Sequence, residues 1–135
     1  MFAIAMAMLV GETGRVIAAD LQPQMLHVLQ RRAEKAGVAE RIRTYRCEPD
    51  RIGLNERIDF ALAFYSAHEV PSLERLLAEI HGGLRSSGKF LVIEPIGHVT
   101  AKDFAKMMSL GAQIGFQEGE RPRVRLSRAA VLTKD

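Results

Sequence analysis

Two patterns of hydrophobic and polar residues alternate along the chain. Residues 15–20 and 58–64 are apolar runs without internal alternation, which is typical of strands covered on both faces. Residues 23–36 instead carry apolar side chains at helical spacing, with Pro23 at the first position and Gly37 after the last. Because such segments keep alternating, the pattern predicts an α/β fold with an open, mostly parallel sheet and helices on both faces.

The remaining elements follow from capping residues and turn signals. Ser72 and Thr100 each begin a helix, and Asp103 completes a capping-box-like start after Thr100. The predicted elements are, in order, a helix over 2–9, a strand over 15–20, a helix over 23–36, strands over 42–47 and 58–64, a helix from 73 to the Gly82-Gly83 pair, a turn at Ser86-Ser87-Gly88, a strand over 89–94, a helix after 100, and strands over 116–119 and 124–133. The last two strands are joined by a short turn, which predicts an antiparallel hairpin at the edge of a mixed sheet.

Length and composition are those of one soluble globular domain spanning residues 1–135. Hydrophobic residues make up 47% of the 135 residues and charged residues 26%. The formal net charge is +3, which favours an ordinary, mildly charged surface over a nucleic-acid surface. The apolar segment 2–10 is too short to span a bilayer and has no basic region before it, so neither a membrane span nor a secretory signal is predicted.

The single cysteine, Cys47, excludes an internal disulfide and is typical of a reducing cytoplasm. It is interpreted as a packed small residue, not as a nucleophile. The four histidines are scattered without the spacing of zinc ligands, so no metal site is predicted.

The strand over 15–20 ends on a carboxylate, Asp20, and a helix follows almost at once. Many open α/β sheets hold the ribose of a nucleotide-like ligand with such an acid, which can accept two hydrogen bonds. The plainer interpretation of Asp20 is a solvated acid at a strand end.

At this point the chain resembles the class I S-adenosylmethionine-dependent methyltransferases. The segment GETGRVIAADLQPQML resembles that family's second strand with its terminal acid and helix start. RIDFALAFYSAHEVPSLERLLAEIHGGLRSSGKFLVIEP is similar to its fourth strand, helix and fifth strand, although Arg85-Ser86-Ser87-Gly88 replaces the usual turn. GFQEGERPRVRLSRAAVLTKD resembles the closing antiparallel hairpin. The resemblance implies a three-layer, Rossmann-like fold, S-adenosylmethionine as cofactor, and methyl transfer to a small molecule.

The resemblance also implies roles for particular residues. The resemblance assigns cofactor binding to residues at the ends of three predicted strands: Asp20, Leu21, Glu48, Phe64 and Tyr65. Asp20 would accept hydrogen bonds from the ribose, and the other residues would line the adenine or the cofactor cleft. The acid near the adenine amino group matches Glu48 better than Asp50. The resemblance also implies that the substrate cleft is lined by Ser66, Glu69, Glu94 and His98. His68 is the candidate general base, because histidine titrates near neutrality, and it is expected to approach the same cleft as His98. The plainer interpretations are ordinary packing for Leu21 and a loop histidine for His68.

One part of the family pattern is missing before Phe2. The resemblance places a central first strand and a Gly-rich turn there, and Gly11 and Gly14 cannot replace them because they follow the first helix. The chain is therefore expected to be an N-terminally truncated domain, to start from a mis-assigned position, or to work without that strand. Two apolar strands beside an empty slot would expose unpaired backbone groups. We expect them either to pair directly in a rearranged sheet or to be covered by a second copy in a homo-oligomer.

Three functions remain open at this stage. The first is a small-molecule methyltransferase or a part of one, and the second is a non-catalytic domain that serves in oligomerisation or interaction. The third is another Rossmann-like nucleotide binder, such as part of a dehydrogenase, which the terminal hairpin disfavours. The missing glycine turn favours loss of cofactor binding by this chain alone.

Overall fold

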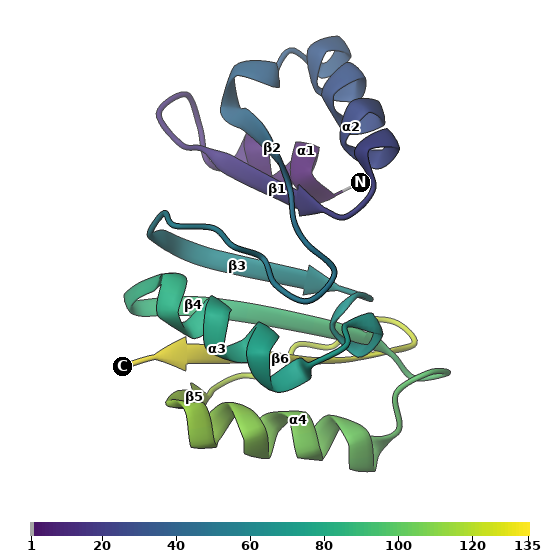
Figure 1. Ribbon diagram of the computed structural model, residues 1–135, viewed down its shortest axis with the longest axis vertical. Helices are drawn as coiled ribbons and strands as arrows, with labels where there is room; N and C mark the ends of the chain where they lie inside the picture. The colour runs from purple at the N-terminus through teal and green to yellow at the C-terminus, as the bar shows by residue number, and fades with distance from the viewer. Residues whose placement is uncertain (1) are drawn as a thin grey trace. The chain divides into compact units, whose positions relative to one another are not determined.

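The computed structural model describes residues 2–135, and the chain divides into two compact units, residues 1–48 and 49–135. Each unit is described by itself. The first contains α1 (Phe2–Leu9), β1 (Val16–Asp20), α2 (Pro23–Ala36), the short 3-10 helix η1 (Ala39–Arg41) and β2 (Ile42–Arg46) (Figure 1). β1 and β2 pair in parallel from Val16 opposite Ile42 to Asp20 opposite Arg46.

The first unit has the helix boundaries that its sequence predicts and only a small core. α2 begins at Pro23 and ends before Gly37, as expected. The buried cluster consists of small side chains: Ala7, Val16, Ala33 and Val38. Arg41 Nη1 also donates to the carbonyl of Ala7 over 3.1 Å, which links η1 to α1.

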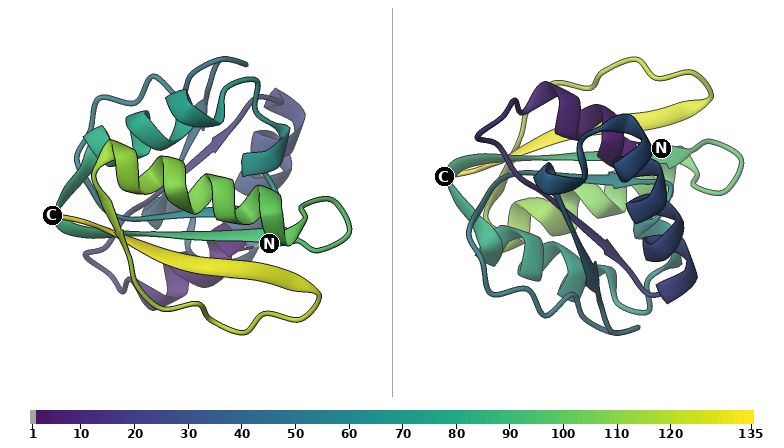
Figure 2. Two further views of the ribbon diagram at one scale, coloured as in Figure 1. Left: turned by 90° about the horizontal axis from the view of Figure 1, so that it is seen from below. Right: turned by 90° about the horizontal axis from the view of Figure 1, so that it is seen from above.

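The second unit contains the larger sheet. Its elements are β3 (Ile58–Phe64), η2 (Ala67–Glu69), α3 (Leu73–Gly83), β4 (Leu84–Pro95), α4 (Ala101–Ile114), β5 (Phe116–Glu118) and β6 (Ser127–Lys134). The strand order is β3-β4-β6-β5. β3 and β4 are parallel, whereas β6 is antiparallel to both β4 and β5. α3 and α4 lie side by side over one face of this sheet (Figure 2). The predicted α/β fold with a C-terminal antiparallel hairpin is confirmed.

Both predicted helix caps in this unit are present. Ser72 Oγ accepts from the amide of Arg75 at the start of α3. Thr100 and Asp103 form a full capping box at the start of α4, in which each side chain accepts from the other residue's amide. These bonds satisfy amides that the first helical turn leaves without an intrahelical partner.

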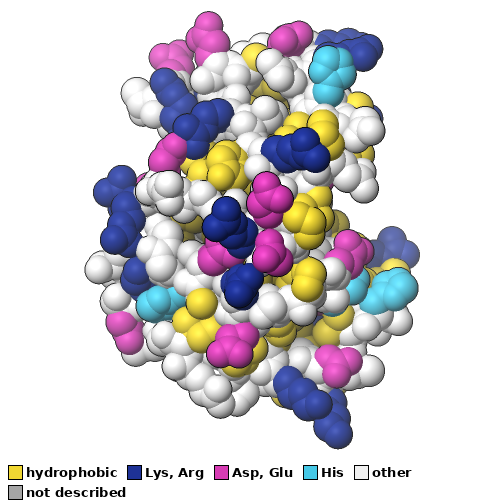
Figure 3. Space-filling view, in the orientation of Figure 1, with side chains coloured by type: hydrophobic (Ala, Val, Ile, Leu, Met, Phe, Trp, Pro, Cys, Tyr) yellow, Lys and Arg dark blue, Asp and Glu magenta, His cyan; other side chains and the backbone are white. Residues whose placement is uncertain are grey.

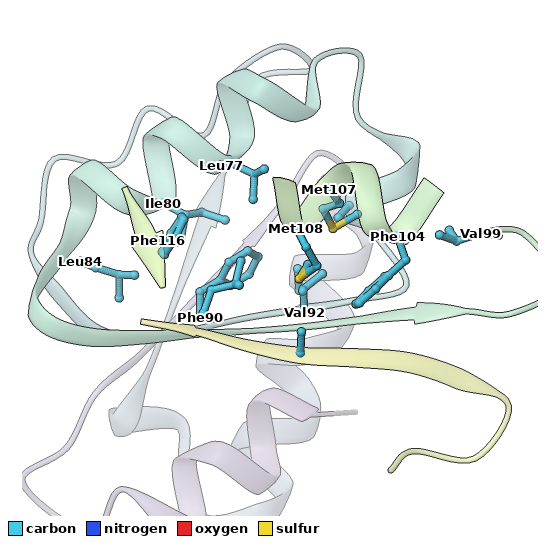
Figure 4. Close-up of a cluster of buried hydrophobic side chains, with 14 residues drawn as sticks. Leu77, Ile80, Leu84, Phe90, Val92, Val99, Phe104, Met107, Met108 and Phe116 are labelled. Carbon is cyan, nitrogen blue, oxygen red and sulfur yellow. The ribbon is translucent and has the colours of Figure 1, made fainter. Parts of the chain in front are cut away.

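The main core lies between the two helices and the sheet. Side chains from α3, α4 and β4 point toward one another in Figure 4, and the ring of Phe116 lies 6.1 Å from that of Phe90 between centroids. The fully buried members with the largest side chains are Phe90, Phe104, Leu77, Leu84, Leu132 and Val92. Packing of this kind holds the ends of β3 and β4 in a fixed position.

Two predicted boundaries were wrong. The Ser86-Ser87-Gly88 segment is not a turn before the strand, because β4 already begins at Leu84. Ile58 pairs with Leu84 and Phe60 with Lys89, so β4 carries extra residues that form an irregularity in the strand. An irregularity of this kind is compatible with turn-like residues inside a strand.

The second boundary concerns the final strand, which begins at Ser127 instead of Val124. The amide of Ser127 donates to the carbonyl of Val124, and Leu126 has a positive φ of 54°. Together they make a turn where a continuous strand was predicted.

Two parallel strands, β1 and β3, each have one strand partner among the described residues. In the described part of the chain β1 pairs only with β2, and β3 pairs only with β4. The two strands belong to different units, and their direct pairing in a rearranged sheet stays a prediction. The homo-oligomer stays a prediction.

The surface carries mixed charges. On the face shown in Figure 3, basic and acidic side chains are interspersed without a broad area of one sign. Within residues 2–135, none of the helices has the length and apolar character needed to cross a membrane.

Candidate functional site

The candidate site of the second unit forms where β3 and β4 end. These strands are parallel, so their carboxyl ends meet at the same edge of the sheet, where open α/β sheets bind ligands. β6 runs in the opposite direction and begins at this edge, with Ser127 opposite Pro95. The chain thereby brings the ends of three strands together from distant parts of the sequence.

Glu94 is the centre of this site. It is the one buried charged residue among those the structure describes, and its exposed fraction is 0%. Its Oε1 accepts from the amide of Ala67 over 2.9 Å, and its Oε2 bonds to Nδ1 of His68. A buried carboxylate needs such partners, because an unpaired buried charge is costly. The short helix η2 supplies both of them from consecutive residues.

His68 is oriented by this contact. When an ionised Glu94 accepts the proton on Nδ1, the other ring nitrogen, Nε2, is left as the group that can take up a proton. Nε2 lies 3.7 Å from Oε1 of Glu69, whose side chain is largely exposed, while the His68 side chain is only 22% exposed. A histidine held by a buried carboxylate is the arrangement of an oriented general base.

His98 joins the site from the segment after β4. Its ring stacks on that of His68, with 5.9 Å between centroids and 8° between planes. Two bonds hold this segment: the amide of His98 donates to the carbonyl of Pro95, and the amide of Ile96 donates to the carbonyl of Leu126. The expected approach of the two histidines therefore agrees with the structure, and their roles stay predictions.

Tyr65 connects the end of β3 to the start of β6. Its backbone has a positive φ of 56°, and its amide donates to the carbonyl of Ile93 over 2.8 Å. Its hydroxyl lies 2.6 Å from Ser127 Oγ, which itself donates to the carbonyl of Arg125. The tyrosine is therefore the donor in the pair. Its ring stacks on Phe64 with 4.1 Å between centroids.

The other predicted residues of this unit are more exposed. Ser66 precedes η2, and its carbonyl accepts from the amide of Glu69. Asp50, the alternative to Glu48 at the adenine, lies 3.3 Å from Arg75 in an exposed ion pair. That partner makes Asp50 the weaker candidate.

In the first unit, Asp20 lies at the carboxyl end of β1 and is half-buried. Its Oδ1 accepts from the amide of Gln22 over 2.9 Å, and its carbonyl accepts from the amide of Cys47. Across residues 2–135, no protein partner of Asp20 Oδ2 is found. This oxygen fits the acceptor that a ribose hydroxyl requires.

Leu21 and Glu48 lie at the same edge of the parallel pair. Leu21 follows Asp20 and is 45% exposed. Glu48 comes two residues after Arg46, which is the register partner of Asp20, and it is exposed. The structure thus collects the three predicted cofactor residues of this unit at one end of its sheet.

Gly14 has a local structural role. A Cβ placed on it would lie 2.3 Å from Cβ of Val10, so only glycine lets the chain pass so close to the end of α1. That the glycines after the first helix cannot replace the cofactor turn stays a prediction. Among the described residues, no group of three or more His, Cys, Asp or Glu is placed to hold a metal ion.

Sequence reasoning missed Ser127 as a member of the site. Its only signal is that it begins the antiparallel partner of β4 directly after an arginine-rich turn. It also missed that Glu94 would be buried and paired with His68. The histidine and the acid are separated by 26 positions in the chain, and nothing local connects them.

Comparison with known proteins identifies the family. A family model described as a methyltransferase domain matches residues 2–92. The chain belongs to this methyltransferase-domain family. It is also 26% identical over 92 residues to the ubiquinone/menaquinone biosynthesis C-methyltransferase UbiE of Blochmanniella pennsylvanica. That match covers 67% of this chain and 36% of the relative, so the chain spans only about a third of the curated relative's length.

Solved structures confirm the fold of this methyltransferase-domain chain. A SAM-dependent methyltransferase from Aquifex aeolicus has a TM-score of 0.84 at 18% identity, covering 97% of this chain and 74% of that one. A methyltransferase from Pyrococcus furiosus has a TM-score of 0.74 at 16% identity, covering 96% and 68%. The [4+2]-cyclase SpnF has a TM-score of 0.75 at 13% identity, covering 96% and 69%. The fold is therefore that of the class I S-adenosylmethionine-dependent methyltransferases, and the cyclase shows that the fold alone does not fix the reaction.

Proposed function

We propose that this chain takes part in S-adenosylmethionine-dependent methyl transfer to a small-molecule acceptor. The observation that carries the proposal is the Asp20 carboxylate at the end of β1, with Oδ2 left to accept from a ribose. The family match supports it, since it covers the segment in which this acid lies. A cytoplasmic location is part of the proposal, because a single cysteine suits a reducing compartment.

The cofactor roles are assigned within each unit. In the first, Asp20 would accept from the ribose hydroxyls, Glu48 from the adenine amino group, and Leu21 would pack on the adenine ring. In the second, Phe64 and Tyr65 would contribute their stacked rings to cofactor binding. When bound, S-adenosylmethionine supplies a methyl group activated by its sulfonium.

The chemistry assigned to the second unit is alignment of the methyl acceptor and removal of its proton. Methyl transfer is a displacement, so the protein mainly orients the acceptor and removes a proton where the nucleophile carries one. His68 is the candidate base, with Glu94 fixing its Nδ1 proton and leaving Nε2 to take up the acceptor's proton. Ser66, Glu69 and His98 are the candidate acceptor contacts.

A calorimetric titration with S-adenosylhomocysteine tests the proposal. Wild-type protein is expected to bind with a micromolar dissociation constant. Asp20→Asn keeps an oxygen for the amide of Gln22 but removes the charge that the ribose hydroxyls meet. It should weaken binding at least about tenfold, since hydrogen bonds to charged groups contribute about 1.5–3 kcal/mol.

Glu12→Gln is the matched control, because Glu12 is an exposed acid of the same unit outside the candidate site. Its binding should equal that of the wild type. Failure of the wild-type chain to bind S-adenosylhomocysteine, in a sample that is folded by circular dichroism, would refute cofactor binding by this chain.

That failure would favour the second candidate function, a non-catalytic module that assembles with another copy. The open edges of β1 and β3 support this alternative, because unpaired strand edges are templates for pairing. Light scattering separates the two outcomes. A stable dimer without cofactor binding supports the module, and a monomer that binds the cofactor supports the methyltransferase.

A further inference from the structure

A cavity of about 310 Å³ in the second unit is not used by the roles assigned so far. It lies between the start of α4 and residues 121–129. Three arginines line it, Arg121, Arg123 and Arg128, together with apolar surface from Phe104, Pro122 and Val124. No carboxylate is part of its lining. Small-molecule sites have volumes that begin near this size, at about 300 Å³.

The cavity exists because β5 is short. After Glu118 the chain leaves the sheet, although the amide of Gly119 still donates to Val131 and the amide of Val131 donates to Glu120. Since backbone direction repeats every second residue, the amide and carbonyl of Ala129 point to the same side as those of Val131. Ala129 lines the cavity, so the unpaired edge of β6 forms one of its polar walls.

The three arginines differ in how far they are already engaged. Arg121 lies over the Phe104 ring at 5.6 Å, and its Nε is 2.5 Å from Glu118 Oε1. Arg128 donates through Nε to the carbonyl of Val99 over 3.1 Å, which fixes its side chain and leaves its two terminal nitrogens as donors. In the described chain, Arg123 has no ion-pair partner. The arginines that line the cavity therefore carry more positive charge than nearby acidic side chains neutralise.

The cavity also adjoins the candidate catalytic cluster. Ser127 lines it and accepts from the hydroxyl of Tyr65, at the edge of the sheet where His68 meets Glu94. Arg128 is the register partner of Glu94. A molecule held in the cavity would thus be anchored next to the groups that are proposed to handle its reactive end.

We propose that this cavity binds a small organic anion, a carboxylate or phosphate carried on a compact apolar body. Guanidinium groups match the planar or forked acceptors of such anions, and Phe104, Pro122 and Val124 fit the apolar part. Resting on the proposed function, the inference further assigns this anion to the methyl acceptor. A nucleic acid is the weaker fit, because the described loop offers no exposed aromatic ring between its arginines on which a base could stack.

The test uses benzoate, phenyl phosphate and neutral benzyl alcohol as probes, with binding followed through the amide signals of residues 121–129. Both anions should shift these signals with dissociation constants on the order of 1 mM, whereas benzyl alcohol should not. The stronger of the two anions tells whether a carboxylate or a phosphate is preferred. Arg123→Gln should weaken both at least about tenfold, because it removes a charged donor from the cavity.

Arg125→Gln is the matched control. It removes the same charge from the same loop, but Arg125 is not part of the lining. Its effect should stay within about twofold. The proposal is overturned if Arg125→Gln weakens binding as much as Arg123→Gln, if benzyl alcohol binds equally well, or if a single-stranded oligonucleotide binds with equal dependence on both arginines.

Titration of the same proteins with S-adenosylhomocysteine keeps the two proposals separate. Arg123→Gln should leave that affinity unchanged. If the chain binds the anions but not S-adenosylhomocysteine, the result would support the anion site and overturn the assignment of the anion to the methyl acceptor.

Discussion

The buried pair of Glu94 and His68 leads to a prediction about stability. Substitution of His68 by alanine leaves a carboxylate with an exposed fraction of 0% and only the amide of Ala67 as a partner. With His68 as a neutral base, its bond to Glu94 is a hydrogen bond to a buried charge, and hydrogen bonds to charged groups contribute about 1.5–3 kcal/mol. Glu94 is fully buried and would keep only the amide of Ala67, so the upper end of that range applies, about 3 kcal/mol.

The same substitution should cost much less when the charge is absent. In Glu94→Gln the side chain keeps its shape, and its carbonyl can still accept from Ala67. His68→Ala in that background then removes one ordinary hydrogen bond and some ring packing, about 1 kcal/mol. The double-mutant cycle is therefore expected to give a coupling free energy of about 2 kcal/mol.

Urea unfolding followed by circular dichroism measures this cycle at equilibrium. The slope of the free energy against urea should remain constant across the variants, so that midpoints report stability. His27→Ala serves as the control, because His27 is an exposed histidine on α2 and its loss should change stability by less than about 0.5 kcal/mol. A His68→Ala cost below about 1 kcal/mol, or an equal cost in both backgrounds, would show that Glu94 is not held as a buried charge.

Two further substitutions test local features by the same unfolding assay. Gly115→Ala should lower the free energy of unfolding by about 1–3 kcal/mol, because the φ of Gly115 is 128° and the new Cβ would lie 2.9 Å from His81 Nε2. The control Gly82→Ala should be neutral or slightly stabilising, because a Cβ at Gly82 would meet nothing within 4 Å. Equal effects of the two substitutions would contradict this prediction. Thr100→Ala should cost about 1 kcal/mol by removing the capping box of α4, and Thr100→Ser should restore most of it; no difference between alanine and serine would rule out capping as the cause.

Much of the fold could be predicted because its signals are local. The apolar runs that became β1 and β3, the proline before α2 and the two capping residues of α3 and α4 each act within a few positions. The irregularity in β4 could not be predicted in this way. Ser86-Ser87-Gly88 has the composition of a turn, and only pairing with β3 shows that the strand has already begun at Leu84.

The candidate site was predicted as a set of strand ends and not as a set of contacts. Asp20, Glu48, His68 and Glu94 were all expected at carboxyl ends of strands, which topology alone determines. Burial of Glu94 depends on β6 lying against β4, a pairing between segments far apart in the sequence. The arginine-lined cavity depends on where β5 stops, and propensity does not fix the length of a strand to one residue.

The modest core of the first unit has a consequence for how a ligand would be held there. Its buried cluster is built from alanines and valines, and these side chains bury little apolar surface. A unit of this kind opens locally at a lower free-energy cost than the larger sheet, whose core contains three phenylalanines and three leucines. Any molecule that Asp20 recognises would stabilise the closed form by a free energy that rises with the logarithm of its concentration above the dissociation constant. Recognition at this end of the chain is thus coupled to folding, and the affinity measured there includes the free energy needed to order the unit.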